Sequence, residues 1–128
     1  KCWGNNFYGQ LGDGTTGFGS NVPVDVVGLG SGVTGITVGG STACALTSAG
    51  GVKCWGSNGG YGQLGDGTFV DSSVPVDVTG LSSGVTAIAT GSCFSCVLMD
   101  TGAVKCWGDG MYGQLTIDTS TPKDVIGF

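Results

Sequence analysis

The string Lys53-Cys54-Trp55-Gly56 has identical copies 52 residues to either side, at residues 1–4 and 105–108. Three other strings also recur along the chain. They are Val-Pro-Val-Asp-Val at 22–26 and 74–78, Gly-Val-Thr at 32–34 and 84–86, and Tyr-Gly-Gln-Leu at 8–11, 61–64 and 112–115. Internal similarity at a fixed period is typical of repeat architectures, in which each repeat is one supersecondary unit. The sequence therefore predicts a repeat protein with a period of 52 residues.

The composition favours short β-strands separated by glycine. Glycine supplies 28 of the 128 residues, apolar residues supply 40% and charged residues only 10%. The glycines follow no collagen period, so they punctuate the chain between strands. Strand-like runs of one period are found at 85–90, 95–99, 103–107 and, in the preceding repeat, 74–78. Four antiparallel strands in each repeat predict an all-β fold built from β-propeller blades.

The cysteines predict the hairpin between the second and third strands of each blade. If Cys44 faces Cys54 across an antiparallel pair, the connecting loop is 48–50, and if Cys96 faces Cys106, it is 100–102. Both loops end in glycine, where a left-handed residue is needed. We therefore expect these two pairs to be disulfides, each stabilising the fold by about 2 to 3 kcal/mol. The fourth strand contains Pro75 and is expected at a sheet edge, because proline cannot donate to a ladder.

The repeat resembles the regulator of chromosome condensation repeat over the whole chain. The strings that carry this resemblance are Gly-Val-Lys-Cys-Trp-Gly-Ser-Asn at 51–58, Tyr-Gly-Gln-Leu-Gly-Asp-Gly-Thr at 61–68, Val-Pro-Val at 74–76 and Gly-Val-Thr-Ala-Ile-Ala at 84–89. Members of that family form seven-bladed propellers. The combination of Cys-Ala-Leu-Thr at 44–47 with Lys-Cys-Trp-Gly is similar to the secreted or surface-anchored bacterial branch of the family. The resemblance thus implies blades of a seven-bladed ring in an oxidising compartment.

Strand counting predicts about two and a half blades of such a ring. Residues 1–28 carry only a third and a fourth strand, residues 29–80 a complete blade, and residues 81–128 a complete blade with a shortened loop. A propeller ring must close to hide its strand edges. We therefore expect either a fragment of a longer propeller, with further blades in the same polypeptide, or a subunit whose copies complete a ring or stack into a filament.

Two other residue types recur with the repeat. We expect the tryptophans to pack between adjacent blades, with each indole N–H bonded to a main-chain carbonyl, although a ring of aromatic side chains on a ligand-binding face is the alternative. We expect the glutamines to cap main-chain groups in the loops between strands. The residues are Trp3, Trp55, Trp107, Gln10, Gln63 and Gln114.

Cys2 and Cys93 are left over once the two hairpin bridges are assigned. Cys93 has no counterpart in the preceding repeat, where Ser41 occupies its place. The two cysteines are expected to be free, paired with residues upstream of Lys1, or joined between chains. A catalytic thiol would need a neighbouring base or cation to lower its pKa, and the chain contains no histidine.

The charged residues exclude several kinds of chemistry. All acids are aspartate, all bases are lysine, and His, Arg and Glu are absent, so His-based catalysis and His metal ligands are excluded. Asp13 and Asp66 lie in Gly-Asp-Gly-Thr strings that suit turns and lack the spacing of a calcium loop. A formal charge of -5 disfavours nucleic acid as a partner, and no apolar run is long enough for a membrane span. We predict no catalytic residue, no cofactor and no metal site.

The sequence favours a non-enzymatic function. The first hypothesis is a secreted or cell-surface propeller module that binds a protein or a glycan through its loops or edges, with enzyme inhibition as a narrower version by analogy with a bacterial inhibitor propeller. The alternative is a structural subunit of an extracellular filament or coat, assembled through open strand edges. Guanine-nucleotide exchange on a small GTPase, an activity in the resembled family, ranks last because no contact motif for it is visible.

Overall fold

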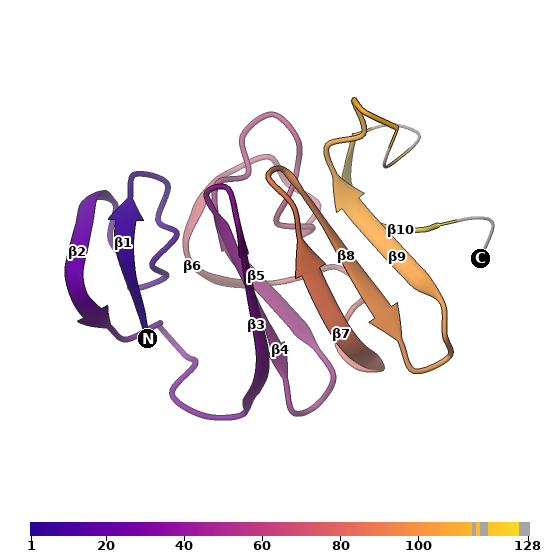
Figure 1. The fold of residues 1–128 in the computed structure, drawn as a ribbon, viewed down its shortest axis with the longest axis horizontal. Helices are drawn as coiled ribbons and strands as arrows, with labels where there is room; N and C mark the ends of the chain where they lie inside the picture. Colours follow the sequence, from indigo (N-terminus) through magenta and orange to yellow (C-terminus); the bar gives the residue numbers. More distant parts are fainter. Residues whose placement is uncertain (114, 116–117, 126–128) are drawn as a thin grey trace.

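The protein is an assembly of short antiparallel strands. A computed structural model describes residues 1–113, 115 and 118–125, and these residues contain strands and turns without any helix. The described residues form ten strands, and Figure 1 shows these strands arranged as neighbouring sheets along the long axis of the molecule. The strands are β1 (Cys2–Asn6), β2 (Gly17–Val24), β3 (Val33–Gly39), β4 (Thr42–Thr47), β5 (Val52–Gly56), β6 (Ser72–Asp77), β7 (Val85–Thr90), β8 (Phe94–Met99), β9 (Val104–Gly108) and β10 (Thr119–Asp124).

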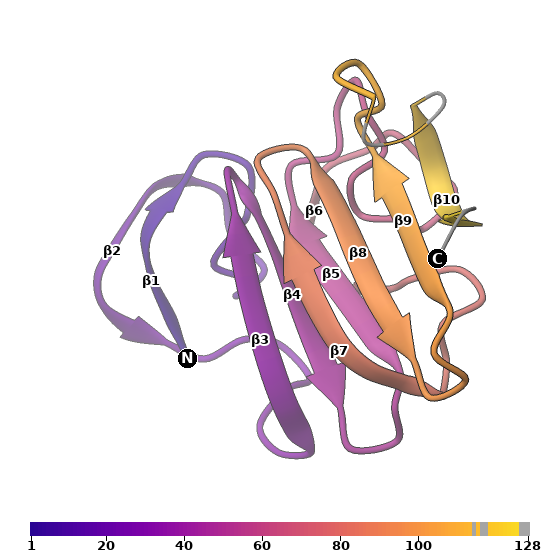
Figure 2. The same cartoon turned by 45° about the vertical axis from the view of Figure 1, so that its right-hand side comes forward.

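The strands form two four-stranded sheets and one two-stranded sheet. Their orders are β3-β4-β5-β6, β7-β8-β9-β10 and β1-β2, and within each sheet consecutive strands pair antiparallel. Figure 2 shows the four-stranded sheets stacked side by side, with β7 next to β3 and β4. The prediction of all-β propeller blades is confirmed. The proline-containing strands β6 and β10 are the outer strands of their sheets, as expected for strands that lack a donor.

The predicted hairpins have the expected register. Cys44 lies opposite Cys54 in the β4–β5 pair, and Cys96 lies opposite Cys106 in the β8–β9 pair. The turn glycines Gly50 and Gly102 have φ values of 77° and 85°, which are in the left-handed region. The fourth strand of the first complete sheet begins two residues earlier than predicted, because Gly56 pairs with Ser72 after a register shift that takes up two extra residues of β6.

Apolar side chains fill the space between the sheets. Successive residues of a strand point to opposite faces, so β4 sends Ala43 and Ala45 toward the β1-β2 sheet and Cys44 and Leu46 toward the β7–β10 sheet. The larger of the two buried clusters contains Cys44, Leu46, Val52, Cys54, Leu64, Val78, Leu81, Val85, Val97 and Trp107. The smaller contains Val26, Ala43, Ala45 and Trp55. Each complete sheet is thereby held to its neighbour by burial of apolar surface.

Candidate functional site

The candidate site is the end of the molecule where the third strand of each sheet passes to the fourth. Three segments lie there, at 7–16, 57–71 and 109–118, and Figure 1 shows the segments that follow β1, β5 and β9 at the same, upper end of the sheets. We call the described residues of these segments the upper rim. Fifteen residues separate β5 from β6, and ten separate β9 from β10. The rim therefore changes shape from one blade to the next.

A buried asparagine organises the segment 57–71. The Asn58 Nδ2 atom lies 3.1 Å from the Thr68 main-chain oxygen, 3.2 Å from the Val70 oxygen and 3.3 Å from Asp66 Oδ1, and donates to them. Its Oδ1 atom accepts a hydrogen bond from the Leu64 N–H. One fully buried amide thus joins the start, middle and end of the loop.

The first repeat contains the same arrangement. Asn6 Nδ2 donates to the Thr15 main-chain oxygen, and Asn6 Oδ1 accepts from the Leu11 N–H. In the third repeat Gly110 stands where this asparagine is expected, and the Gly-Asp-Gly-Thr string is absent as well. These two asparagines were not among the residues predicted from the sequence. The 52-residue interval between Asn6 and Asn58 was the signal that could have identified them.

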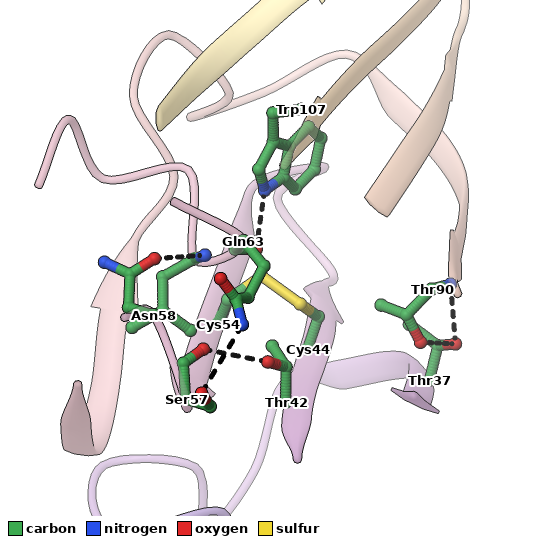
Figure 3. The surroundings of a disulfide bond; sticks show 10 residues. Thr37, Thr42, Cys44, Cys54, Ser57, Asn58, Gln63, Thr90 and Trp107 are labelled. Atoms are coloured by element: carbon green, nitrogen blue, oxygen red, sulfur yellow. Dashed lines mark hydrogen bonds between the residues drawn. A yellow bond between two sulfur atoms is a disulfide. The ribbon is translucent and has the colours of Figure 1, made fainter. Parts of the chain in front are cut away.

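The predicted role of the tryptophans is visible at two of the three positions. The Nε1–H of Trp55 donates to the Gln10 carbonyl, and that of Trp107 donates to the Gln63 carbonyl, both at 2.9 Å. Figure 3 shows the second of these bonds above the Cys44–Cys54 disulfide. Trp3 differs, because 65% of its surface is exposed. No described sheet packs against the face of β1 on which Trp3 lies.

The glutamine side chains do not share one role. Gln10 caps a main-chain group, since its Oε1 accepts from the Tyr8 N–H, and its Nε2 donates to Asn5 Oδ1. Gln63 instead donates from Nε2 to Ser57 Oγ at 3.4 Å, and its buried Oε1 has no hydrogen-bond partner among the described residues. The main-chain carbonyls at these two positions are the tryptophan acceptors described above. Gln114 lies outside the described residues.

The cysteines divide into two bridges and two thiols. Disulfides join Cys44 to Cys54 and Cys96 to Cys106, as the hairpin register predicted. Cys2 and Cys93 are free and half-buried. Burial raises the pKa of both thiols, and the negative charge of Asp109 raises the pKa of Cys93 further. Neither thiol is therefore activated as a nucleophile at neutral pH.

The aspartates of the upper rim are used in turns. Asp13 Oδ1 accepts hydrogen bonds from the Thr15 hydroxyl and the Thr15 N–H, and these bonds lower the pKa of the Asp13 carboxyl. Asp66 accepts from Thr68 in the same way. Asp71 Oδ1 accepts from the N–H groups of Asn58 and Gly59. In the described part of the chain, no group of three or more Cys or Asp side chains is placed to hold a metal ion.

Charge is distributed unequally between the two ends of the sheets. Five of the nine aspartates belong to the upper-rim segments, which contain no lysine: Asp13, Asp66, Asp71, Asp109 and Asp118. At the other end, three lysines at the start of third strands form ion pairs with aspartates at the end of fourth strands. The pairs are Lys1–Asp25, Lys53–Asp77 and Lys105–Asp124. The charges of the remaining Asp100 and Lys123 cancel, so the five aspartates of the upper rim account for the whole formal charge of -5.

The upper rim also exposes large apolar side chains. Phe69 and Val70 stand out from the segment 57–71, and Met111 and Tyr112 from the segment 109–118. In the first segment Phe7 and Tyr8 are exposed, and the Phe7 ring contacts the Phe18 ring edge to face. No described helix is long and apolar enough to cross a lipid bilayer. The upper rim thus combines an excess of aspartates with exposed aromatic and aliphatic side chains.

The repeats of this chain match a known repeat family. Sequence profiles of the regulator of chromosome condensation (RCC1) repeat match residues 2–46 and 49–98, and a second profile of the same repeat matches 33–63 and 85–114. The chain belongs to this family. The RCC1 repeats of this chain are similar to those of the human E3 ubiquitin-protein ligase HERC2, with 40% identity over 115 residues, 88% of the chain and 2% of the ligase.

Other relatives of the RCC1-repeat chain show how much of a propeller it represents. The mitochondrial RCC1 domain-containing protein RUG3 of Arabidopsis thaliana is 35% identical over 96% of the chain, which covers 29% of RUG3. The crystal structure of human WBSCR16 superposes with a TM-score of 0.80 at 25% identity, over 97% of the chain and 32% of that structure. Prp20p of Saccharomyces cerevisiae superposes with a TM-score of 0.74 at 18% identity, over 98% of the chain and 33% of Prp20p. The chain spans less than a third of the length of HERC2 and of RUG3.

Proposed function

We propose that this RCC1-repeat chain is part of a non-enzymatic propeller that recognises a protein partner through the upper rim. The observation that carries the proposal is the exposure of Phe69, Val70 and Met111 on a rim that holds the entire net charge. Aromatic residues and methionine are enriched in the cores of protein interfaces, where they fill pockets on the partner. The exposed apolar side chains of the rim belong to neither of the buried clusters that hold the sheets together.

The charge of the upper rim selects the class of partner. Complementary charge speeds encounter and suppresses wrong partners, so an acidic rim favours a lysine- or arginine-rich protein segment. The exposed aromatic rings add cation–π contacts with the same basic side chains. Of the solved relatives, Prp20 was crystallised bound to Kap60, and a second study concerned its binding to Gsp1p and histones. Those partners belong to Prp20, and they support protein recognition as a use of this fold.

The cellular location is a second part of the proposal. Two disulfides are compatible with an oxidising compartment. We infer an extracellular or cell-surface protein of the cysteine-containing bacterial type, in which the bridges replace part of the core that a short repeat lacks. Peptide mapping of the protein from its native source, after alkylation without reductant, is expected to show Cys44, Cys54, Cys96 and Cys106 protected and Cys2 and Cys93 alkylated.

Selection from a random peptide library tests the recognition proposal. The immobilised protein is expected to enrich peptides that combine lysine or arginine with an aromatic residue. A Phe69→Ser/Met111→Ser variant should bind the selected peptides with an affinity lower by at least about tenfold, because interface anchors carry most of the binding energy. Val22→Ser is the matched control, since Val22 is equally exposed on β2 away from the rim. Enrichment of acidic peptides, or equal loss in the control, would show that the proposal is wrong.

A further inference from the structure

Asn58 differs from the other asparagines of the chain because a glycine follows it. The chain contains four asparagines, at 5, 6, 21 and 58, and the residues that follow the first three are Asn6, Phe7 and Val22. The main-chain nitrogen of the residue after an asparagine can attack the side-chain amide carbon. A following glycine hinders this attack least, because it has no Cβ. Asn58-Gly59 is therefore the pair of this chain that is chemically most prone to ring closure.

Asp71 holds the nitrogen that would attack. Its Oδ1 atom accepts hydrogen bonds from the Asn58 N–H at 2.6 Å and from the Gly59 N–H at 3.0 Å. Ring closure requires the Gly59 nitrogen to lose its proton, and the adjacent carboxylate opposes the formation of a second negative charge there. The third repeat has an equivalent bond from the Gly110 N–H to Asp118 Oδ1, but its segment contains no asparagine. In the closed loop, the attacking group is thus blocked by Asp71.

The side-chain amide that would be attacked is also fixed. The Asn58 Nδ2 atom faces four oxygen atoms at 3.1 to 3.3 Å, which belong to Asp66, Thr68 and Val70. Its Oδ1 atom accepts from the Leu64 N–H at 2.9 Å, and the whole side chain is buried. Rotation of this side chain toward the attacking nitrogen would break these bonds inside the protein, where unpaired polar groups are costly. The reaction therefore requires the loop to open first.

The product of the reaction does not fit the closed loop. Nδ2 is the shared donor for four oxygen atoms, whereas a carboxylate in its place has only acceptors. One of the four is Asp66 Oδ1, which would face a second carboxylate. The isoaspartate product also lengthens the main chain by a methylene group. Neither product allows the loop to close as before, so the modification is a permanent record of loop opening.

We propose that Asn58-Gly59 is a latent deamidation site, which Asp71 and the closed loop protect and which reacts irreversibly when the segment 57–71 opens. The modification replaces a neutral amide on the upper rim by a carboxylate and removes the hydrogen bonds that organise this segment. The upper rim of the second repeat would thereby lose its shape after each chain has opened for long enough. The proposal is independent of partner recognition, because it concerns the chemistry of the loop and is measured without a partner.

The covalent change takes place in two steps. The Gly59 nitrogen attacks Cγ of Asn58, the Cγ–Nδ2 bond breaks, and the leaving amide takes up the proton from the Gly59 nitrogen and departs as ammonia. The result is a cyclic imide. Water then adds to one of the two imide carbonyls and opens the ring, which gives aspartate or isoaspartate. Water is the co-reactant, and no oxidant or reductant is needed.

Peptide mapping by mass spectrometry measures the rate. The full chain is kept folded at mildly alkaline pH, or unfolded in concentrated urea at the same pH, and is then reduced and digested with trypsin. Asn58 is the single asparagine of the tryptic peptide 54–105, and fragment spectra assign the mass gain to it. Isomerisation of Asp66, which also precedes a glycine, changes no mass. We expect the reaction at Asn58 to be slower in the folded chain by at least about a hundredfold, because the loop must open first.

Matched variants test the role of Asp71. Asp71→Ala removes the acceptor of both N–H groups and should raise the rate at Asn58 in the folded chain by at least about tenfold, because hydrogen bonds to a charged group are lost. Asp118→Ala removes the equivalent bond of the third repeat and should leave the rate unchanged. Gly59→Ala adds a Cβ at an ordinary 3.7 Å from Asp71 Oδ1 and should lower the rate in the unfolded chain toward that of Asn21.

Hydrogen exchange tests the same proposal without a substitution, so the test does not depend on the stability of the Asp71→Ala variant. Urea below the unfolding midpoint should raise the rate at Asn58 and the exchange rate of the Leu64 N–H by the same factor, since both need the loop to open. Equal rates at Asn58 in folded and unfolded chains, or equal rates in Asp71→Ala and Asp118→Ala, would overturn the proposal. A rate at Asn58 that does not respond to this urea would overturn it too, because the site would then react without opening.

Discussion

The two complete sheets have the same strand order and are built from equivalent repeats, but they differ in their neighbours. The β3–β6 sheet has described neighbours on both faces, β1-β2 on one side and β7–β10 on the other, whereas the β7–β10 sheet has a described neighbour on one face. The rim segment of the β3–β6 sheet keeps the buried Asn58 and the Gly-Asp-Gly-Thr turn. The segment of the other sheet has lost both and is five residues shorter.

Comparing the two sheets shows which glycines are required by the turn alone and which are also required by packing against the next sheet. Gly62 and Gly113 occupy the same place in the Tyr-Gly-Gln string, and both have positive φ, 71° and 82°. A Cβ at Gly62 would lie 2.5 Å from the Ser120 Cα of the next sheet, whereas a Cβ at Gly113 would meet no described heavy atom within 4 Å. The positive φ of the turn favours glycine in both blades. Only at Gly62 does the close approach of the next sheet also leave no room for a side chain.

The largest expected effect follows from that pair of glycines. Gly113→Ala should cost about 1 kcal/mol, the strain of alanine in a left-handed conformation. Gly62→Ala should cost about 4 kcal/mol, because overlap with the Ser120 main chain adds to the same strain. Urea unfolding of the two variants measures the difference. Equal losses would mean that the sheets separate without cost and that the interface is not a constraint.

The two disulfides extend the comparison to the sheet faces. Both close loops with a sequence separation of 10, so the loop-entropy contribution is the same, about 3 kcal/mol. Cys44 and Cys54 are fully buried between sheets, whereas Cys96 is partly exposed. The Cys44→Ala/Cys54→Ala variant should therefore lose more stability than the Cys96→Ala/Cys106→Ala variant.

Reduction of the native protein checks the same point without a substitution. Dithiothreitol should open Cys96–Cys106 first, and alkylation followed by peptide mapping identifies the order. Faster loss of Cys44–Cys54 would contradict the burial difference on which the comparison rests.

The asparagine network predicts a third effect. Asn58→Ala should destabilise the protein by about 2 kcal/mol, because it leaves the buried Leu64 N–H without its acceptor. Asn5→Ala is the control, since Asn5 accepts hydrogen bonds from the Phe7 N–H and Gln10 Nε2 at the exposed surface. Its loss should stay near 0.5 kcal/mol, that is, about the size of a typical exposed hydrogen bond. A comparable loss in both variants would remove Asn58 from its organising role.

The sequence predicted the repeated features and failed where neighbouring repeats act on each other. The period, the hairpins and the bridge register follow from residues that recur at 52-residue intervals, such as Cys44 and Cys96. The different side-chain roles of Gln10 and Gln63 could not be read from the sequence, because only the folded loops bring Gln10 within hydrogen-bond distance of Asn5 and Gln63 within hydrogen-bond distance of Ser57.

Exposure was equally hidden from the sequence. Trp3 and Trp107 have the same local string, but 65% of the first side chain is exposed and none of the second. What covers a blade face lies in another repeat, so no local pattern reports it. The net charge on the upper rim also emerged only when the strand order placed the ion-paired lysines at the opposite end.

The smallest expected effect concerns the turn that the shortened segment lacks. The Thr15 hydroxyl and N–H lower the pKa of the Asp13 carboxyl, so this turn stabilises the folded state above the unfolded pKa, and the contribution is lost as pH falls through the folded value. Thr15→Val removes the hydroxyl donor and should raise the pKa of Asp13 toward its ordinary range, whereas Thr15→Ser should restore it. Carboxyl carbon chemical shifts followed by NMR from pH 2 to 6 measure the change. An unchanged titration in Thr15→Val would exclude the hydroxyl as a cause of the lowered Asp13 pKa and leave the main-chain N–H groups of Thr15 and Asp13 and the Asn6 side chain. The Gly-Asp-Gly-Thr string would then need threonine only for its bond with Asn6 Nδ2.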